Sequence, residues 1–145
     1  YNNEKVEILG NSLKNEGFEV KKINIIVGKD YKKFIDEINE CSYIISSSLH
    51  GVIMGLVYKK NTFQINFSNK VLGKNFKFND FYESIKTNYE LKNIYNHKIL
   101  NNPIEIDYVN LNNLAVNLIN ICPFISNDRK NILLKKYKDY YVNLY

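Results

Sequence analysis

The stretch CSYIISSSLHGVIMGLVYKKNTFQINF, residues 41–67, decides the fold that we expect. Its first part, residues 42–46, is apolar and β-branched enough to predict a buried strand. Residues 49–57 are apolar on nearly all sides, which predicts a buried helix, and residues 62–67 predict the next strand. Together these segments are typical of a βαβ unit in a doubly wound sheet, where ligands bind at the carboxyl ends of the strands.

A turn of small polar residues joins the first predicted strand to the helix. It contains Ser46, Ser47 and Ser48, and His50 and Gly51 follow. Hydroxyls and the free amides at the start of a helix can donate to phosphate or carboxylate oxygens. The alternative is that one serine caps the helix, which needs no more than one. A histidine at a helix start can act as a general acid or base near neutral pH, so His50 is a candidate catalytic residue, unless it only hydrogen-bonds to a loop. Gly51 permits close approach of a ligand, or packs the helix on the sheet.

The residues before this stretch alternate in the same way. Helical spacing predicts a helix over residues 3–15, loose alternation predicts a strand over 18–26, and Asp30 is expected to cap a helix over 31–39. The order is helix, strand, helix, strand, helix, strand. This order predicts an α/β fold in which helices cover a parallel sheet.

After residue 67 the sequence becomes polar and basic. Lys70 and Lys77 follow the last predicted strand, where they bind a small anion or belong to a solvated loop. Asn79 or Asp80 is expected to cap a short helix through residue 85, and a loop with a short strand near 91–95 follows.

Two further helices are predicted at the carboxyl end of the chain. Asp107 is expected to cap a helix that ends at Cys122-Pro123-Phe124, and Ser126 or Asn127 starts a last helix through about residue 142. We find no internal repeat and no linker, so we expect a single domain over residues 1–145.

The composition limits the possible partners and the compartment. The chain has 145 residues with 45% hydrophobic and 24% charged, and its lysines are scattered, so the net charge of +5 indicates a solvated surface and no nucleic-acid partner. The two cysteines favour buried thiols in the reducing cytoplasm. Two distant histidines without a neighbouring cysteine or carboxylate cluster predict no metal site, and His97 is expected to have a surface role.

Three sequence blocks form an ordered set. They are S-S-S-L-H-G with the following helix and strand (46–67), K-F-N-D-F-Y-E-S (77–84), and C-P-F after an apolar helix (122–124). Together they resemble the polysaccharide pyruvyl transferase family and span most of the chain. The resemblance implies one half of a GT-B-like fold, namely a Rossmann-like carboxyl-terminal domain. The amino-terminal domain would then be absent, and this fragment would be inactive alone.

The resemblance also implies an activity. Pyruvate would pass from phosphoenolpyruvate to a sugar of a cell-surface polysaccharide and form a ketal on two hydroxyls, without a cofactor. The acceptor would be a glycan or a lipid-linked sugar, which would place the enzyme in the cytoplasm, with peripheral association at the inner face of the membrane.

Site residues are carried over onto matching positions. His50 matches the histidine of the family motif and would be the catalytic acid or base. Some family members have an arginine where Ser48 stands, so here lysines, the absent domain or a different donor would have to account for the missing charge. The expected donor-binding residues are Ser46, Ser47, Ser48, Gly51, Lys70 and Lys77.

Two other readings compete with this one. The first is a GT-B glycosyltransferase domain that uses a nucleotide-sugar donor. The second is a basic binding module without enzymatic activity, in which lysines and not His50 carry the binding.

Overall fold

The computed structural model describes residues 3–24, 30–67, 76–89, 91, 93 and 95–142. The chain divides into two compact units, Tyr1–Glu105 and Ile106–Tyr145, and each is described by itself. The single domain expected from the sequence stays a prediction. In chain order the elements are α1 (Asn3–Asn15), α2 (Tyr31–Glu40), β1 (Tyr43–Ser46), α3 (Leu49–Val57), β2 (Asn61–Gln64), α4 (Phe76–Ser84), the 3-10 helix η1 (His97–Leu100), α5 (Tyr108–Ile121) and α6 (Asn127–Val142).

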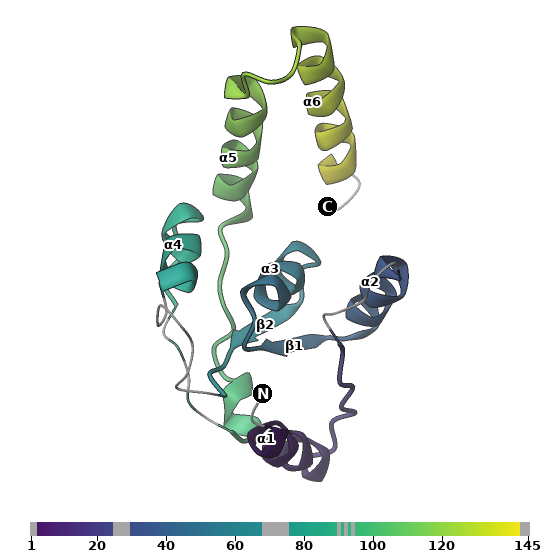
Figure 1. Cartoon of the computed structure of the whole chain (residues 1–145), viewed down its shortest axis with the longest axis vertical. Helices are drawn as coiled ribbons and strands as arrows, with labels where there is room; N and C mark the ends of the chain where they lie inside the picture. Colours follow the sequence, from purple (N-terminus) through teal and green to yellow (C-terminus); the bar gives the residue numbers. More distant parts are fainter. Residues whose placement is uncertain are drawn as a thin grey trace. The chain divides into compact units, whose positions relative to one another are not determined.

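The predicted strand–helix–strand stretch forms the centre of the first unit. β1 and β2 pair in parallel, with Tyr43 opposite Asn61 and Ser46 opposite Gln64. α3 has the predicted bounds and packs against both strands (Figure 1). The α/β class is therefore confirmed, with a parallel sheet of two strands in the described part of the chain.

The two faces of this sheet are covered differently. On one face, a Cβ added to Gly55 of α3 would lie 2.4 Å from the Thr62 Oγ1 and 3.1 Å from the Ile44 Cβ, so glycine permits the close approach of the helix. Because side chains alternate along a strand, Phe63 and Ile65 lie on the opposite face. There they form the buried core with Leu9 and Leu13 of α1 and Ile99 of η1.

The segment before α2 differs from the prediction. Residues 18–24 form no strand, so the strand expected over 18–26 is wrong for its described part, and the last two residues of that range lie outside the described residues. Side chains hold the segment instead. Lys21 pairs with two carboxylates of α2, and Lys22 pairs with Glu7 of α1. Neighbouring lysines are thus drawn to different helices, and no ladder with β1 is needed to place the segment.

The region after β2 also departs from the prediction. α4 begins at Phe76, so the expected cap at Asn79 or Asp80 is wrong. The helix starts earlier because Phe78 and Tyr82, four residues apart, bury one helical face. The turn η1 was not predicted; the Asn96 side chain caps it by accepting a hydrogen bond from the Lys98 amide.

The second unit consists of α5 and α6, which pack against each other. Asp107 caps α5 as predicted, because its carboxylate accepts a hydrogen bond from the Asn110 amide at 3.0 Å. The Ser126 hydroxyl accepts from the Arg129 amide at 3.4 Å, which confirms the predicted start of the last helix. The Tyr137 hydroxyl on α6 donates to the Asn112 side chain on α5 at 3.0 Å.

Candidate functional site

The turn between β1 and α3 is closed by its own first serine. The Ser46 Oγ accepts a hydrogen bond from the Ser48 amide at 3.0 Å and donates to the Ser48 carbonyl at 3.1 Å. Ser48 occupies the N-cap position of α3, but its hydroxyl makes no capping bond. Ser46 therefore shapes the turn, while the Ser48 hydroxyl takes no part in capping the helix.

Gly51 brings the first turn of α3 close to the end of β1. A Cβ at this position would lie 2.3 Å from the Ser46 Oγ and 3.0 Å from the Ser46 Cβ. Real side chains do not approach so closely, so any larger residue would push the helix start away from the strand. Gly51 thus allows the first-turn amides of α3 to lie close to the carboxyl end of β1.

His50 lies at the second position of α3, and it is exposed. An imidazole there lies beside the amides of the first helical turn, which have no partners within the helix. The structure leaves its side chain accessible to a ligand in solvent.

A pocket of about 240 Å³ runs from the serine turn along the outer edge of β1. Four of the predicted site residues, Ser46, Ser47, Ser48 and Gly51, line it, and its remaining walls come mainly from α1, α2, β1 and residues near Lys21. His50 and Lys77 do not line it. Lys77 is exposed on α4, and Lys70 lies outside the described residues. The structure therefore gathers the turn residues, whereas Lys77 is not among the residues that line this pocket.

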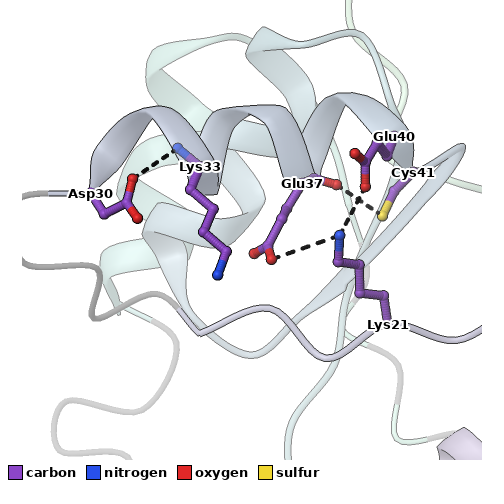
Figure 2. A network of polar contacts seen from close by, with 6 residues as sticks. All are labelled: Lys21, Asp30, Lys33, Glu37, Glu40 and Cys41. Atoms are coloured by element: carbon purple, nitrogen blue, oxygen red, sulfur yellow. Dashed lines mark hydrogen bonds and ion pairs between the residues drawn. The ribbon is translucent and has the colours of Figure 1, made fainter.

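The one lysine that lines the pocket is already neutralised within the described residues. Figure 2 shows Lys21 reaching toward both Glu37 and Glu40. The Lys21 Nζ lies 2.8 Å from the Glu40 Oε2 and 3.7 Å from the Glu37 Oε1. The hydrogen bond to Glu40 raises the pKa of Lys21. Beside them, the Cys41 thiol donates to the Glu37 carbonyl at 3.3 Å. An anion is thus better placed at the serine end of the pocket than at this wall.

A second polar cluster lies at the carboxyl end of β2. The Tyr82 hydroxyl on α4 donates to the side-chain Oε1 of Gln64 at 2.8 Å. The Tyr89 hydroxyl accepts from the backbone amide of Gln64 at 3.3 Å. Burial raises the pKa of Tyr82, and desolvation also raises that of Tyr89, so both hydroxyls stay protonated at neutral pH. Tyr82 is buried in the core, and no local sequence signal marked Gln64 or its pairing with Tyr82.

His97 lies away from the serine turn in sequence and pairs with a carboxylate. Its Nδ1 lies 3.2 Å from the Glu16 Oε1, and its backbone amide donates to the Ser12 hydroxyl. These bonds attach η1 to α1, so His97 contributes to the packing of the first unit.

The described residues form neither a metal centre nor a membrane-spanning helix. No group of three histidine, cysteine or carboxylate side chains is placed to hold a metal ion in the described part of the chain. None of the helices among the described residues has the length and apolar character that crossing a membrane requires. Comparisons with protein-family models, with curated proteins and with solved structures find no match to this chain.

Proposed function

We propose that this chain belongs to an enzyme that transfers pyruvate from phosphoenolpyruvate to a sugar of a cell-surface polysaccharide and forms a ketal. One observation carries the proposal: an exposed His50 follows a serine turn at the carboxyl ends of two parallel strands. The three sequence blocks that resemble the pyruvyl transferase family support it. The architecture that we propose is the Rossmann-like half of a GT-B-like fold.

The proposed donor carries a phosphate and a carboxylate, so its site needs hydrogen-bond donors and positive charge. The first-turn amides of α3 and the hydroxyls of Ser47 and Ser48 supply donors at one place. Lys77, exposed on α4, is the described lysine that we propose as the cationic partner. Lys70 has the same proposed role and lies outside the described residues.

The proton balance of the reaction defines the part of His50. One acceptor hydroxyl adds to the enol carbon that carries the phosphate and loses its proton, while the methylene carbon gains a proton and becomes a methyl group. A second sugar hydroxyl then loses its proton, displaces phosphate and closes the ketal. An imidazole side chain can accept a hydroxyl proton and return one to the methylene carbon.

We propose the cytoplasm as the compartment and a glycan or lipid-linked sugar at the inner face of the membrane as the acceptor. Both cysteines, Cys41 and Cys122, are free thiols in this structure. Unpaired thiols fit a reducing compartment, which supports this placement.

The test is phosphate release by the full-length protein from phosphoenolpyruvate in the presence of an acceptor glycan. We expect His50→Ala to lower kcat by about 10²- to 10⁴-fold, because a general acid–base catalyst is lost. His97→Ala is the matched control, because His97 pairs with Glu16 and lies outside the turn.

Two outcomes would overturn the proposal. Nucleotide release from a nucleotide sugar, without phosphate release from phosphoenolpyruvate, would identify a GT-B glycosyltransferase instead. An unchanged function of His50→Ala, with loss of binding when exposed lysines become glutamate, would identify a basic binding module.

A further inference from the structure

Gln64 lies next to the serine turn, on the same face of the sheet. It is the register partner of Ser46 in the parallel pair, and register partners on neighbouring strands project to the same side, with strands about 4.8 Å apart. The approach of Gly55 to Ile44 and Thr62 identifies that side as the face covered by α3. Gln64 is thus the β2 counterpart of the residue that closes the turn.

The side chain of Gln64 is buried and its orientation is determined. Gln64 is 3% exposed, and its Oε1 accepts a hydrogen bond from the buried Tyr82 hydroxyl at 2.8 Å. The Tyr82 ring packs on Phe81 and Tyr89, with ring centroids 5.6 Å and 5.7 Å away. Because Tyr82 stays protonated and donates, the oxygen of the amide faces Tyr82 and the nitrogen faces away from it.

The two N–H donors of this amide remain available. No hydrogen bond from the Gln64 Nε2 to another residue is found in the described part of the chain. No fully buried side-chain nitrogen or oxygen among the described residues lacks a hydrogen-bond partner, so the Gln64 Nε2 has access to solvent, and an oxygen of a bound ligand or a water molecule can accept from it. An uncharged donor of this kind, beside hydroxyls and helix amides, is suited to an oxyanion.

We propose that the Gln64 side-chain amide donates a hydrogen bond to an oxyanion oxygen, phosphate or carboxylate, of the donor substrate bound at the serine turn. This inference rests on the proposed function. It adds a specificity-determining residue from β2 to a site otherwise built from β1 and α3. Tyr82 acts through Gln64, as a positioning residue that turns the amide toward the ligand.

The sequence offers a direct probe, because Gln64 is the only glutamine among the 145 residues. Labelling the chain with glutamine that carries ¹⁵N in its side chain gives one ¹⁵N amide resonance. We expect this signal and the backbone amide signals of Ser47 and Ser48 to shift with one common Kd on titration with phosphoenolpyruvate. Parallel titrations with inorganic phosphate and with pyruvate show which oxyanion the amide contacts.

Two patterns contradict the inference, and they are distinguishable. Shifts at Ser47 and Ser48 without a shift of the Gln64 signal would leave the proposed site intact and exclude Gln64 from it. No shift at any of the three with phosphoenolpyruvate would overturn the proposed donor site and with it the role of Gln64.

Variants separate ligand binding from a purely structural role. Gln64→Glu keeps an oxygen acceptor for Tyr82 but lacks the N–H donors, and Gln64→Met lacks them without adding charge. We expect both to weaken phosphoenolpyruvate binding by about 10- to 100-fold. Tyr82→Phe retains the Gln64 amide, so it is expected to lower thermal stability while weakening binding less. A Gln64→Met protein that binds like the wild type would overturn the proposal.

Discussion

The two outer edges of the β1–β2 sheet are held by different kinds of interaction. On the β2 edge, the Tyr89 hydroxyl accepts a hydrogen bond from the backbone amide of Gln64 at 3.3 Å. On the same edge, the Ile104 amide donates to the Thr62 carbonyl at 2.9 Å. On the β1 edge, no backbone hydrogen bond joins the strand to residues 18–24 within the described part of the chain. Side chains hold that segment instead: Phe18 packs edge-on against Tyr43, Val20 packs against the core, and ion pairs reach α1 and α2.

This difference separates a rigid edge from an adaptable one. Buried hydrogen bonds contribute about 0.5–1.5 kcal/mol each and strongly penalise the loss of one partner, whereas exposed ion pairs contribute little and are screened by salt. The pocket lies along the β1 edge, and the Gln64–Tyr82 pair lies on the β2 side. A site placed between them has one fixed wall and one wall that can adjust to a ligand.

The largest effect is expected from removing the ring that anchors the β2 side. Tyr82→Ala deletes a buried aromatic side chain and leaves the Gln64 Oε1 without its donor, so we expect a loss of about 3–5 kcal/mol in the free energy of unfolding. Urea unfolding followed by circular dichroism measures it. Tyr31→Ala is the control, because Tyr31 is 68% exposed. Equal losses in the two variants would mean that the β2 side is no better held than the surface.

A smaller loss of stability is expected from a substitution in α3, the helix that packs against both strands. Gly55→Ala places a Cβ 2.4 Å from the Thr62 Oγ1, and we expect this overpacking to lower the free energy of unfolding by about 1–3 kcal/mol. In α1, a Cβ at Gly10 would meet its nearest neighbour, the Val20 Cγ1, at 3.9 Å. Gly10→Ala should therefore stabilise the protein by up to about 1 kcal/mol, because alanine favours helix. A Gly55→Ala protein that is as stable as the wild type would contradict the close packing of α3.

Alkaline pH tests whether the β2 edge depends on neutral tyrosines. Burial raises the pKa of Tyr82 above its ordinary value of 10.0. The folded-state pKa of Tyr82 exceeds the unfolded-state value. The stabilisation of the fold by the neutral Tyr82 hydroxyl is therefore complete below pH 10 and is lost as the pH rises toward the folded-state pKa. Between about pH 9 and pH 11, Tyr82→Phe should lose about 1 kcal/mol less stability than the wild type. The same pH dependence in both proteins would show that Tyr82 is solvated in the folded state.

The parts of the fold that the sequence predicted depend on local signals. Asp30 accepts from the Lys33 amide at 3.3 Å, a contact three residues along the chain, and Asp107 does the same at α5. α3 was predicted because a largely apolar run of nine residues between turn residues favours a buried helix over other structures. The strand expected before α2 failed because alternation alone does not supply a pairing partner. The segment is placed by side-chain contacts to residues far along the chain, such as Phe18 with Tyr43 and Lys21 with Glu40.

The candidate site was predicted in a similar, partial way. The serine turn is a local feature and forms where expected, but the internal use of the Ser46 hydroxyl depends on the turn conformation and has no sequence signal. Gln64 and Tyr82 are 18 residues apart and on different elements, so only the tertiary fold brings them together. The roles of His50, Lys77 and Lys70 stay predictions.

The smallest effect on global stability is expected at the β1 edge. Lys21→Ala removes both ion pairs to α2, yet Lys21 and Glu40 are exposed and Glu37 is only half-buried, so the midpoint of urea unfolding should stay unchanged within error. The change should be local, because residues 18–24 lose their attachment to α2 while the sheet and α3 keep theirs. Amide hydrogen exchange should accelerate in residues 18–24 alone, and about 1 M salt should produce the same acceleration in the wild type by screening the pairs. Faster exchange that extends into β1 and β2 would show that the Lys21 ion pairs support the sheet itself, and the two edges would then not differ in the way their contacts indicate.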